Sequence, residues 1–374
     1  MIWKPRHILL TNSSDIYAGG EFYVYSLAKE LQTRGHRALV VCKPANLLRE
    51  KCEQAGIPVV PVDFPAQGNL LRHINFLRKQ IVQHSIDLVH TNTNYDRTAG
   101  AFAAWRKHVP HITNVHSFHS LQHNVTHWIR NRWATDRFIV DGVCVKEMLV
   151  RENGIHESRI SVVHLGVDPR EMKRDDQSRR KVRVSFGYGD DEIVIGNVAR
   201  LVPFKGHEYL VRAFAASSLQ FPRARLLLVG DGELRDDLTS LAGSLGIQHR
   251  VAFAGFRDDL REVYSAFDVY VHPSVEGGGE TFPFAVLQAL SQELPVVVTR
   301  VGDVAEMVEE GSNGFVVTDR SAGALAEKLH ILLQDGAPRL EMGRRSGEYL
   351  LRRFTHRQMV DAVVAIYASV IETQ

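Results

Sequence analysis

The fold is decided by residues 7–42, HILLTNSSDIYAGGEFYVYSLAKELQTRGHRALVVC. The apolar run at its start predicts a strand, and a polar loop that ends in two glycines follows. From residue 21 to 34 apolar positions recur every three or four residues, which predicts an amphipathic helix. Gly35 is the expected helix stop, and residues 37–42 predict a second strand. A strand, a helix and a strand in this order are typical of a parallel β-α-β unit.

The same alternation runs through the rest of the chain. Further strands are predicted at 59–62, 86–90, 112–115, 138–140 and 160–164, and then at 193–197, 225–229, 251–253, 268–271, 295–299 and 315–317. In the second half helices are predicted at about 207–218, 233–245, 259–266, 283–292, 303–310, 322–334 and 357–371. The pattern predicts an α/β protein with two doubly wound, Rossmann-like domains, each a parallel sheet covered on both faces.

A chain of 374 residues suits two domains of similar size. Residues 1–168 form the predicted first domain, and residues 192–356 form the second. The stretch 169–191 between them is highly charged and then rich in turn residues, which indicates a linker and the entry helix of the second domain. Two such domains would place a ligand cleft between the carboxyl ends of their sheets.

Composition excludes several classes of protein. No apolar stretch reaches the roughly 18 residues that span a bilayer, and the start lacks the pattern of a signal peptide. Three scattered cysteines without metal-ligand spacing favour a reduced, cytoplasmic setting. The fingerprint G-x-G-x-x-G does not occur, which argues against a nicotinamide dehydrogenase. Basic residues form no stripe with base-stacking aromatics, so a nucleic-acid partner is not expected.

Charge is distributed unevenly between the halves. Residues 1–168 carry a net charge of +6 and 13 of the 18 histidines, whereas the remainder carries −4. A basic half indicates an anionic partner, such as a phosphorylated acceptor or an acidic membrane surface. An ordinary solvated surface explains the same charge, and both interpretations stay open.

Two motifs in the second half point to chemistry. Arg200 and Lys205 follow the strand 193–197, and two cations at a strand end could hold a diphosphate and neutralise its growing charge. Glu280 lies on a loop just before a helix whose first residue is expected to be Pro283. Gln288 follows Glu280 by eight residues.

This second motif resembles the E-x7-E signature of retaining GT-B glycosyltransferases, the glycosyltransferase family 4 type, with Gln288 in place of the second glutamate. The resemblance extends over nearly the whole chain and is strongest from residue 193 to 317. It implies a GT-B fold in which the final helix, about 357–374, packs back on the first domain. It also implies that Arg200 and Lys205 bind the donor diphosphate and that Glu280 binds the donor sugar.

The remaining site residues are also implied by this resemblance. Gln288 would face the ribose hydroxyls, and because an amide accepts one hydrogen bond and donates one, its binding would be weaker than that of glutamate or differently oriented. The expected donor-binding set is Gly19, Gly20, Gly232, Glu233, Phe256, Thr281, Phe282, Pro283, Phe284 and Gln288. His116, at the end of the strand 112–115, would contact the donor sugar. His119 and His123 follow it, but this trio lacks a carboxylate or thiolate at helical spacing, so a metal site is not expected.

The implied reaction moves a sugar from a UDP- or GDP-linked donor to an acceptor hydroxyl with retention at the anomeric carbon. No acidic D-x-D signature lies in a suitable loop, so metal independence is expected, and no cofactor is expected besides the donor. Segments 70–79 and 128–133 mix basic and apolar residues. They indicate either ordinary amphipathic helices or contact with the inner face of a cytoplasmic membrane, with a glycolipid or lipopolysaccharide-core acceptor. Two rival functions remain, a GT-B sugar-nucleotide epimerase and a non-catalytic nucleotide-sugar binder.

Overall fold

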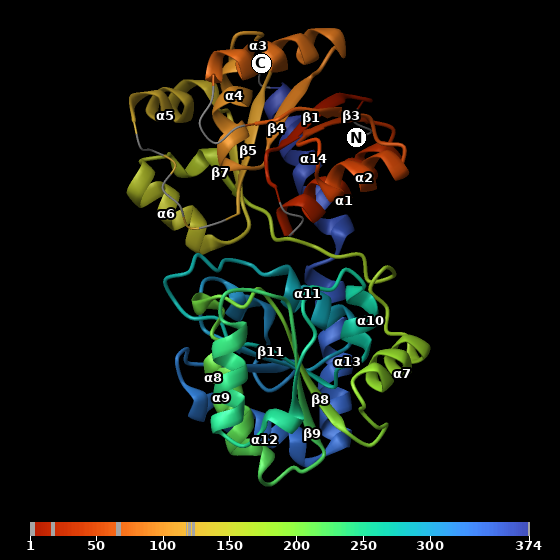
Figure 1. Ribbon diagram of the computed structural model, residues 1–374. Helices are drawn as coiled ribbons and strands as arrows, with labels where there is room; N and C mark the ends of the chain where they lie inside the picture. Colours follow the sequence, from red (N-terminus) through yellow and green to blue (C-terminus); the bar gives the residue numbers. More distant parts are fainter. Residues whose placement is uncertain are drawn as a thin grey trace. The chain divides into compact units, whose positions relative to one another are not determined.

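The computed structural model describes residues 4–15, 19–64, 69–116, 118, 121 and 124–372. These residues form two compact units. The first comprises the chain up to Leu165 together with the final helix from His356, and the second comprises Gly166–Thr355. Each unit is a parallel β-sheet with helices on both faces, as Figure 1 shows. In the described part of the chain, no helix has both the length and the apolar character needed to cross a bilayer.

The first unit has a seven-stranded sheet of order β3-β2-β1-β4-β5-β6-β7, in which every neighbouring pair is parallel. Its strands are β1 His7–Asn12, β2 Arg37–Cys42, β3 Val59–Pro61, β4 Leu88–Thr91, β5 His111–Val115, β6 Arg137–Val140 and β7 Ile160–Val162. Its helices are α1 Gly19–Thr33, α2 Leu47–Gln54, α3 Leu70–Gln83, α4 Asn94–Trp105, α5 Val125–Ile129, the π-helical η1 Arg130–Ala134, α6 Val143–Asn153, the 3-10 turn η2 Glu157–Arg159 and α14 His356–Glu372.

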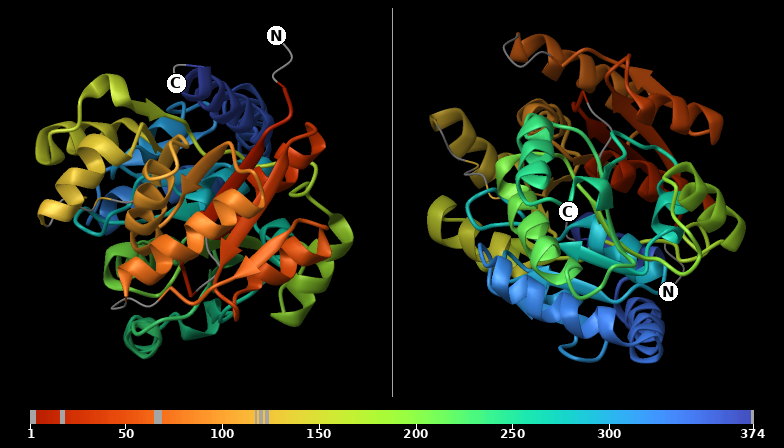
Figure 2. Two further views of the ribbon diagram at one scale, coloured as in Figure 1. Left: turned by 90° about the horizontal axis from the view of Figure 1, so that it is seen from above. Right: turned by 60° about the horizontal axis from the view of Figure 1, so that its bottom comes forward.

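The helices of this unit divide between the two faces of the sheet. α1 contacts α2 and α14, whereas α3 packs against α4, and the two groups lie on opposite faces in the view from above in Figure 2. Apolar side chains of β1, β2 and β4 meet those of α3 and α4 in a continuous core that contains Leu9, Leu39, Leu77 and Val89. Strands buried on both faces explain why their sequences are almost entirely apolar.

The second unit has a six-stranded parallel sheet of order β10-β9-β8-β11-β12-β13. Its strands are β8 Ile193–Val198, β9 Ala224–Val229, β10 Val251–Phe253, β11 Val269–His272, β12 Val296–Thr299 and β13 Gly314–Val317. Its helices are α7 Asp176–Ser185, η3 Pro203–Lys205, α8 His207–Ser218, α9 Arg235–Ser244, η4 Gln248–Arg250, α10 Leu260–Ser265, α11 Phe284–Ser291, η5 Val304–Met307, α12 Ala322–Gln334 and α13 Gly336–Arg353.

Two features of this unit differ from the sequence prediction. The helix α13 is absent from the prediction because Gly336 and Pro338 suggest a break; Asp335 caps the helix, and proline is tolerated in a first turn. The helix predicted at 303–310 is only the 3-10 turn η5. The helix does not continue past η5, because the Glu309 N–H donates to the Asn313 side chain at 2.7 Å and the chain then enters β13.

Candidate functional site

The chemistry-bearing residues of the second domain lie where its sheet changes winding direction. From β8 the chain winds outward through β9 to β10, whereas β11, paired directly with β8, leads outward through β12 to β13. Loops after two such strands separate and leave a crevice at the carboxyl edge of the sheet. Arg200 and Lys205 follow β8, and Glu280 follows β11, so these three predicted residues lie on two loops at the same edge of the sheet.

Glu280 is the centre of a buried polar cluster. Its Oε2 atom accepts hydrogen bonds from the Lys205 ammonium at 2.5 Å, the Ser274 hydroxyl at 2.7 Å and the His272 Nε2–H at 3.0 Å. All three donors meet the same carboxylate oxygen. His272 and Ser274 are fully buried and Glu280 is 9% exposed. The cluster therefore holds the carboxylate in one orientation and directs its other oxygen, Oε1, away from these donors.

The cluster keeps Glu280 ionised. Burial raises the pKa of Glu280, but the hydrogen bonds from His272 and Lys205 and the charge of Lys205 lower it by more, so the pKa lies well below its ordinary value. Burial lowers the pKa of His272 despite the neighbouring carboxylate, so we assign the neutral ring with its proton on Nε2. Its Nδ1 then accepts from the Tyr270 hydroxyl at 3.4 Å. The result is a fixed anion paired with one cation, Lys205.

Arg200 and Lys205 share one aromatic ring. The guanidinium carbon of Arg200 lies 5.9 Å from the centroid of Phe204, and Lys205 Nζ lies 5.2 Å from it. Gly206 makes this arrangement possible, because it adopts a positive φ of 66° and an added Cβ would lie 2.0 Å from the Pro273 oxygen. Phe204 itself packs against Gly278, where a Cβ would come within 2.1 Å of the Phe204 side chain.

The loops after β9 and β10 join the same edge. Gly232 lies so close to the Arg200 loop that a Cβ would sit 2.4 Å from the Leu201 oxygen. The Gly230 N–H donates to the Gly255 oxygen at 2.8 Å and ties the two loops together. Glu233 and Phe256, the predicted nucleotide contacts on these loops, have exposed side chains, and Phe256 is 73% exposed. An exposed phenylalanine at a strand end offers a flat apolar surface to a ligand.

The segment after Glu280 leads into α11. Pro283 is the residue that caps this helix and not, as the sequence predicted, its first residue; α11 begins at Phe284. Thr281 and Phe282 are buried, and the Phe282 ring packs edge-on against Phe354 with centroids 5.3 Å apart. The Phe282 side chain therefore belongs to the core, which leaves only its backbone for a ligand. Pro283, Phe284 and Gln288 are partly exposed.

The first domain has a second set of predicted residues at the carboxyl edge of its own sheet. β1 and β4 are neighbours there from which the chain winds in opposite directions. A cavity of about 470 Å³ lies at this point and is lined by Gly20, Glu21, Arg97 and His116 among others. Gly19 and Gly20 open α1, and a Cβ on Gly20 would lie 4.0 Å from His116 Cδ2. The two predicted elements, the glycine loop and His116, thus lie side by side.

His116 is held by a carboxylate that the sequence analysis did not single out. Its Nδ1 lies 2.9 and 2.8 Å from the two carboxylate oxygens of Asp141, which is itself buried. Because a carboxylate only accepts, Nδ1 carries a proton. Burial lowers the pKa of His116, but Asp141 raises it more, and the net shift is upward. Asp141 follows β6 as His116 follows β5, so two parallel strands ending at one edge were the signal for this pair.

Arg97 is a further residue that sequence reasoning missed. It is 3% exposed and donates to Thr113 Oγ1 at 2.8 Å, to the Asn114 oxygen at 2.8 Å and to Asn94 Oδ1 at 2.9 Å. Burial lowers the pKa of Arg97 to about 10, so the group remains a cation at neutral pH. Its place within α4 gives no sequence signal, because a helical arginine is ordinarily exposed. Arg97 and His116 line the first-domain cavity together with the carboxylates Asp15 and Glu21.

His119 and His123, weighed above as metal ligands, lie outside the described residues. Among the residues that are described, no group of three or more histidine, cysteine, aspartate or glutamate side chains is arranged to hold a metal ion.

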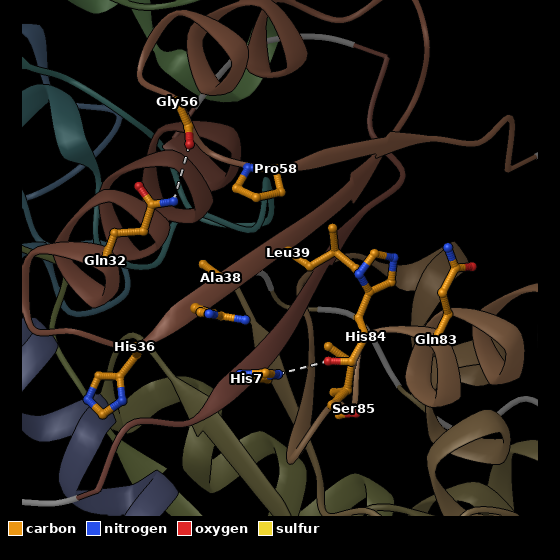
Figure 3. Close-up of a pocket in the computed structure, with 12 residues that line it drawn as sticks. His7, Gln32, His36, Ala38, Leu39, Gly56, Pro58, Gln83, His84 and Ser85 are labelled. Carbon is orange, nitrogen blue, oxygen red and sulfur yellow. Dashed lines mark hydrogen bonds between the residues drawn. The ribbon is translucent and has the colours of Figure 1, made fainter.

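A separate cavity of about 530 Å³ lies at the amino-terminal edge of the first sheet and is shown in Figure 3. His7 and Arg37, register partners at the starts of β1 and β2, line it together with His36 and His84. The His7 Nδ1–H donates to the His84 oxygen at 2.8 Å, drawn as a dashed line. Helices end at this edge, and basic residues complement their carbonyl ends. None of the predicted site residues lines this cavity.

Comparison with known families supports the division into two functional halves. Residues 17–171 match the model of Glycosyltransferase Family 4, and residues 178–349 match the model of Glycosyl transferases group 1. Taken together the two matches cover most of the chain. The second model spans the Arg200, Lys205 and Glu280 loops, and the first spans Gly19, Gly20 and His116.

Individual relatives are also named glycosyltransferases. The chain is 31% identical over 220 residues to an uncharacterized glycosyltransferase of Methanocaldococcus jannaschii (58% of this chain, 55% of the relative). It is 34% identical over 179 residues to the lipopolysaccharide core biosynthesis glycosyltransferase LpsE of Rhizobium meliloti (48% and 51%). These alignments span about half the length of each relative. The fold is similar to that of Anabaena HepE in complex with UDP, with a TM-score of 0.83 at 24% identity over 97% of this chain and 100% of that one. This likeness identifies the fold as GT-B.

Proposed function

We propose that this chain, which belongs to the GT-B glycosyltransferases of the family 4 and group 1 type, moves a sugar from a nucleotide-sugar to an acceptor hydroxyl with retention at the anomeric carbon. The observation that carries the proposal is the buried cluster in which Lys205, His272 and Ser274 hold the Glu280 carboxylate at the strand-end crevice of the second domain. A fixed anion beside the cations Lys205 and Arg200 suits a ligand with both sugar hydroxyls and phosphates.

The donor diphosphate would be bound by Lys205 and Arg200. Without a ligand, Lys205 is neutralised by Glu280, whereas Arg200 is exposed beside Phe204. A diphosphate would compete with Glu280 for the Lys205 ammonium and draw it toward the phosphates. These cations then stabilise the negative charge that grows on the leaving diphosphate, so we propose that no metal ion is required.

The donor sugar and nucleoside would be oriented by the Glu280 loop and its neighbours. Glu280 Oε1, which faces away from the three donors that meet Oε2, would accept from a sugar hydroxyl. The backbone N–H groups of Thr281, Phe282 and Phe284, near the amino-terminal end of α11, would bind phosphate or sugar oxygens. Gln288 would bind the ribose diol. Gly232, Glu233 and Phe256 would lie near the base of a UDP- or GDP-linked sugar.

In the first domain, Gly19, Gly20 and His116 would complete the donor contacts. We propose that His116, with Nδ1–H directed at Asp141, presents its other ring nitrogen to a sugar hydroxyl, and that Arg97 adds positive charge to the same cavity.

The protein would contribute to the reaction mainly by positioning the reactants and by stabilising the charge on the leaving diphosphate. In the front-face route that we favour, the bond between the anomeric carbon and the diphosphate oxygen breaks while a bond to the acceptor oxygen forms on the same face. The acceptor proton passes to the leaving phosphate oxygen. No protein nucleophile is needed, and the binding residues supply orientation and electrostatic stabilisation.

The acceptor is proposed to belong to a cell-surface glycan, with a lipopolysaccharide core or another glycolipid as the first candidate. The support is the name of the Rhizobium relative, a lipopolysaccharide core biosynthesis glycosyltransferase, and the net charge of +6 over residues 1–168, which suits a phosphorylated glycan. We further propose that the enzyme works on the cytoplasmic side at an anionic membrane surface.

The test is slow donor hydrolysis. The purified chain is incubated with UDP-, GDP-, ADP- and CMP-sugars in the presence of a chelator, and the released sugar is followed by NMR. Release of one nucleoside diphosphate with the α-configured sugar first, from an α-linked donor, is expected. Initial release of the β anomer would overturn retention, and turnover that requires added metal would overturn metal independence.

Gln288 supports one alternative, a nucleotide-sugar binder without turnover. Calorimetry with the same donors separates the two functions: binding of a donor with no release, even with a panel of glycan acceptors, would favour the binder.

A further inference from the structure

The tryptophans of the first domain gather in one exposed place. Trp105, Trp128 and Trp133 are 48%, 43% and 56% exposed, and they are all the tryptophans that the structure describes. The rings of Trp128 and Trp133 meet edge-on with centroids 5.0 Å apart, and Trp133 lines a cavity of about 380 Å³ with Trp105. We call these three residues the tryptophan patch. Trp side chains are on average highly buried, so three exposed together indicate a surface with a partner.

In the segment that carries Trp133, polar side chains are buried and the aromatic side chain is exposed, which is the reverse of the usual pattern. In η1 the polar Arg130 and Asn131 are 2% and 4% exposed, whereas Trp133 faces solvent. Arg130 anchors the segment by donating to Thr98 Oγ1 at 2.8 Å and to the Leu121 oxygen at 2.5 Å. Because buried polar groups fix η1 against α4, the outward position of its aromatic ring is enforced and does not result from loose packing.

Basic residues adjoin two of these tryptophans in the sequence. Arg106 and Lys107 follow Trp105, Arg132 precedes Trp133, and in the described part of the chain none of the three forms an ion pair. Asp136 is the acidic residue that lines the shared cavity, and its Oδ2 accepts from the His111 N–H at 2.7 Å. Indole rings flanked by unpaired arginine and lysine match the boundary of an anionic bilayer, where the rings sit among the headgroups and the cations meet lipid phosphates.

We propose that the tryptophan patch is the surface by which the first domain docks on an anionic lipid bilayer. The patch lies at the amino-terminal ends of β5 and β6, whereas His116 and Asp141 lie at the carboxyl ends of the same strands. Strands of four or five residues separate the two edges by about 15 Å. Docking therefore leaves the first-domain cavity uncovered. This proposal rests on the proposed glycolipid acceptor, which would explain why the domain docks on a membrane. Its test does not require turnover.

The experiment uses the full chain with Trp3→Phe, so that all indole fluorescence comes from the patch. Vesicles of phosphatidylcholine alone and with about 30 mol% phosphatidylglycerol are added at low salt, and sedimentation and emission are recorded. We expect retention by the anionic vesicles, a blue shift of emission and quenching by brominated lipid. The triple change Trp105→Ser, Trp128→Ser and Trp133→Ser should weaken retention at least tenfold.

A charge-matched pair of variants completes the design. Arg106→Gln, Lys107→Gln and Arg132→Gln together should also weaken retention at least tenfold, whereas Arg344→Gln, Arg345→Gln and Arg352→Gln, on α13 of the other domain, should not. Retention without a blue shift, or equal losses in both triples, would overturn the proposal. So would failure of anionic vesicles to retain the protein, including the case in which the patch instead mediates self-association seen by sedimentation velocity. Donor hydrolysis measured without lipid reports separately on the proposed transferase.

Discussion

The Nζ atom of Lys205 lies 2.5 Å from Oε2 of Glu280, and this ion pair joins the loops that follow β8 and β11. Both side chains are largely buried, at 15% and 8% exposure. The pair lets a buried cation and a buried anion offset each other's charge. In the proposed donor complex, Lys205 would exchange the Glu280 carboxylate for the diphosphate.

Removing one member of this pair should damage both stability and activity. Lys205→Met leaves a buried carboxylate with only His272 and Ser274, and we expect a loss of about 3 kcal/mol in the free energy of unfolding. The double variant with Glu280→Gln should recover most of that loss but none of the donor turnover. Urea unfolding and kcat/KM measure the two effects.

The control for that experiment is a pair in the same domain whose carboxylate is exposed. Lys328 Nζ lies 2.9 Å from Glu327, whose side chain is 68% exposed. Lys328→Met should cost less than about 1 kcal/mol. Full turnover in Lys205→Met would contradict the assigned role of Lys205, and an unfolding loss no greater than that of Lys328→Met would contradict the burial argument.

Gly206 offers a test of how closely the two loops must approach. Gly206 and Gly246 have similar positive φ angles of 66° and 71°, but a Cβ on Gly246 meets nothing within 4 Å, whereas on Gly206 it meets the Pro273 oxygen at 2.0 Å. Gly246→Ala should cost only the backbone strain, about 1 kcal/mol. Gly206→Ala should cost more and lower kcat/KM about 100-fold, because Lys205 must move. Equal effects of the two substitutions would show that the close approach is unimportant.

Much of the fold follows from periodicity in the sequence. Strands such as β8 and β12 are short apolar runs, and their alternation with amphipathic helices predicts a parallel sheet covered by helices. The missed helix α13 shows the limit of that reasoning, since a capped helix can contain Gly336 and Pro338 in its first turn. Local signals of that kind are decided by the capping residue, here Asp335.

The sites were predictable only in part, for a physical reason. Lys205 and Glu280 stand in motifs with fixed spacing, so the sequence places them near a crevice. Their contacts with His272 and Ser274 depend on the approach of two loops, which no spacing reveals. Asp141 could have been found, because it ends a strand next to that of His116. Arg97 could not, since nothing in a helix distinguishes a buried arginine.

Gln288 stands where the family signature has glutamate, and its replacement can be reversed. In Gln288→Glu a carboxylate would accept two ribose hydroxyls through charge-assisted hydrogen bonds, so we expect the donor KM to fall about tenfold. The kcat should stay within a factor of three, because ribose contacts are made equally before and during the reaction. Initial-rate kinetics over a range of donor concentrations measure both values. A large rise in kcat would instead identify Gln288 as the mark of a degenerate site.

The pairing of His116 with Asp141 predicts how the stability of the protein depends on pH. Asp141 raises the pKa of His116 against the effect of burial, so the folded pKa exceeds that of the unfolded chain. A raised pKa stabilises the protein fully below the unfolded value near 6.5, and this contribution is lost as the pH rises through the folded value. Asp141→Asn removes the main cause of the rise and leaves burial and Arg97, which lower the pKa, opposed by Glu21, so the pKa of His116 should fall.

Two measurements check this prediction. The NMR titration of the His116 ring should move to lower pH in Asp141→Asn. The stability lost in that variant should be largest below pH 6 and should shrink as the pH rises above the titration of His116 in the original chain. Asp361→Asn serves as the control, because its carboxylate pairs with Arg34 on the surface of the same domain and should leave the His116 titration unchanged. An unshifted His116 titration in Asp141→Asn would show that the carboxylate does not set the charge of this ring.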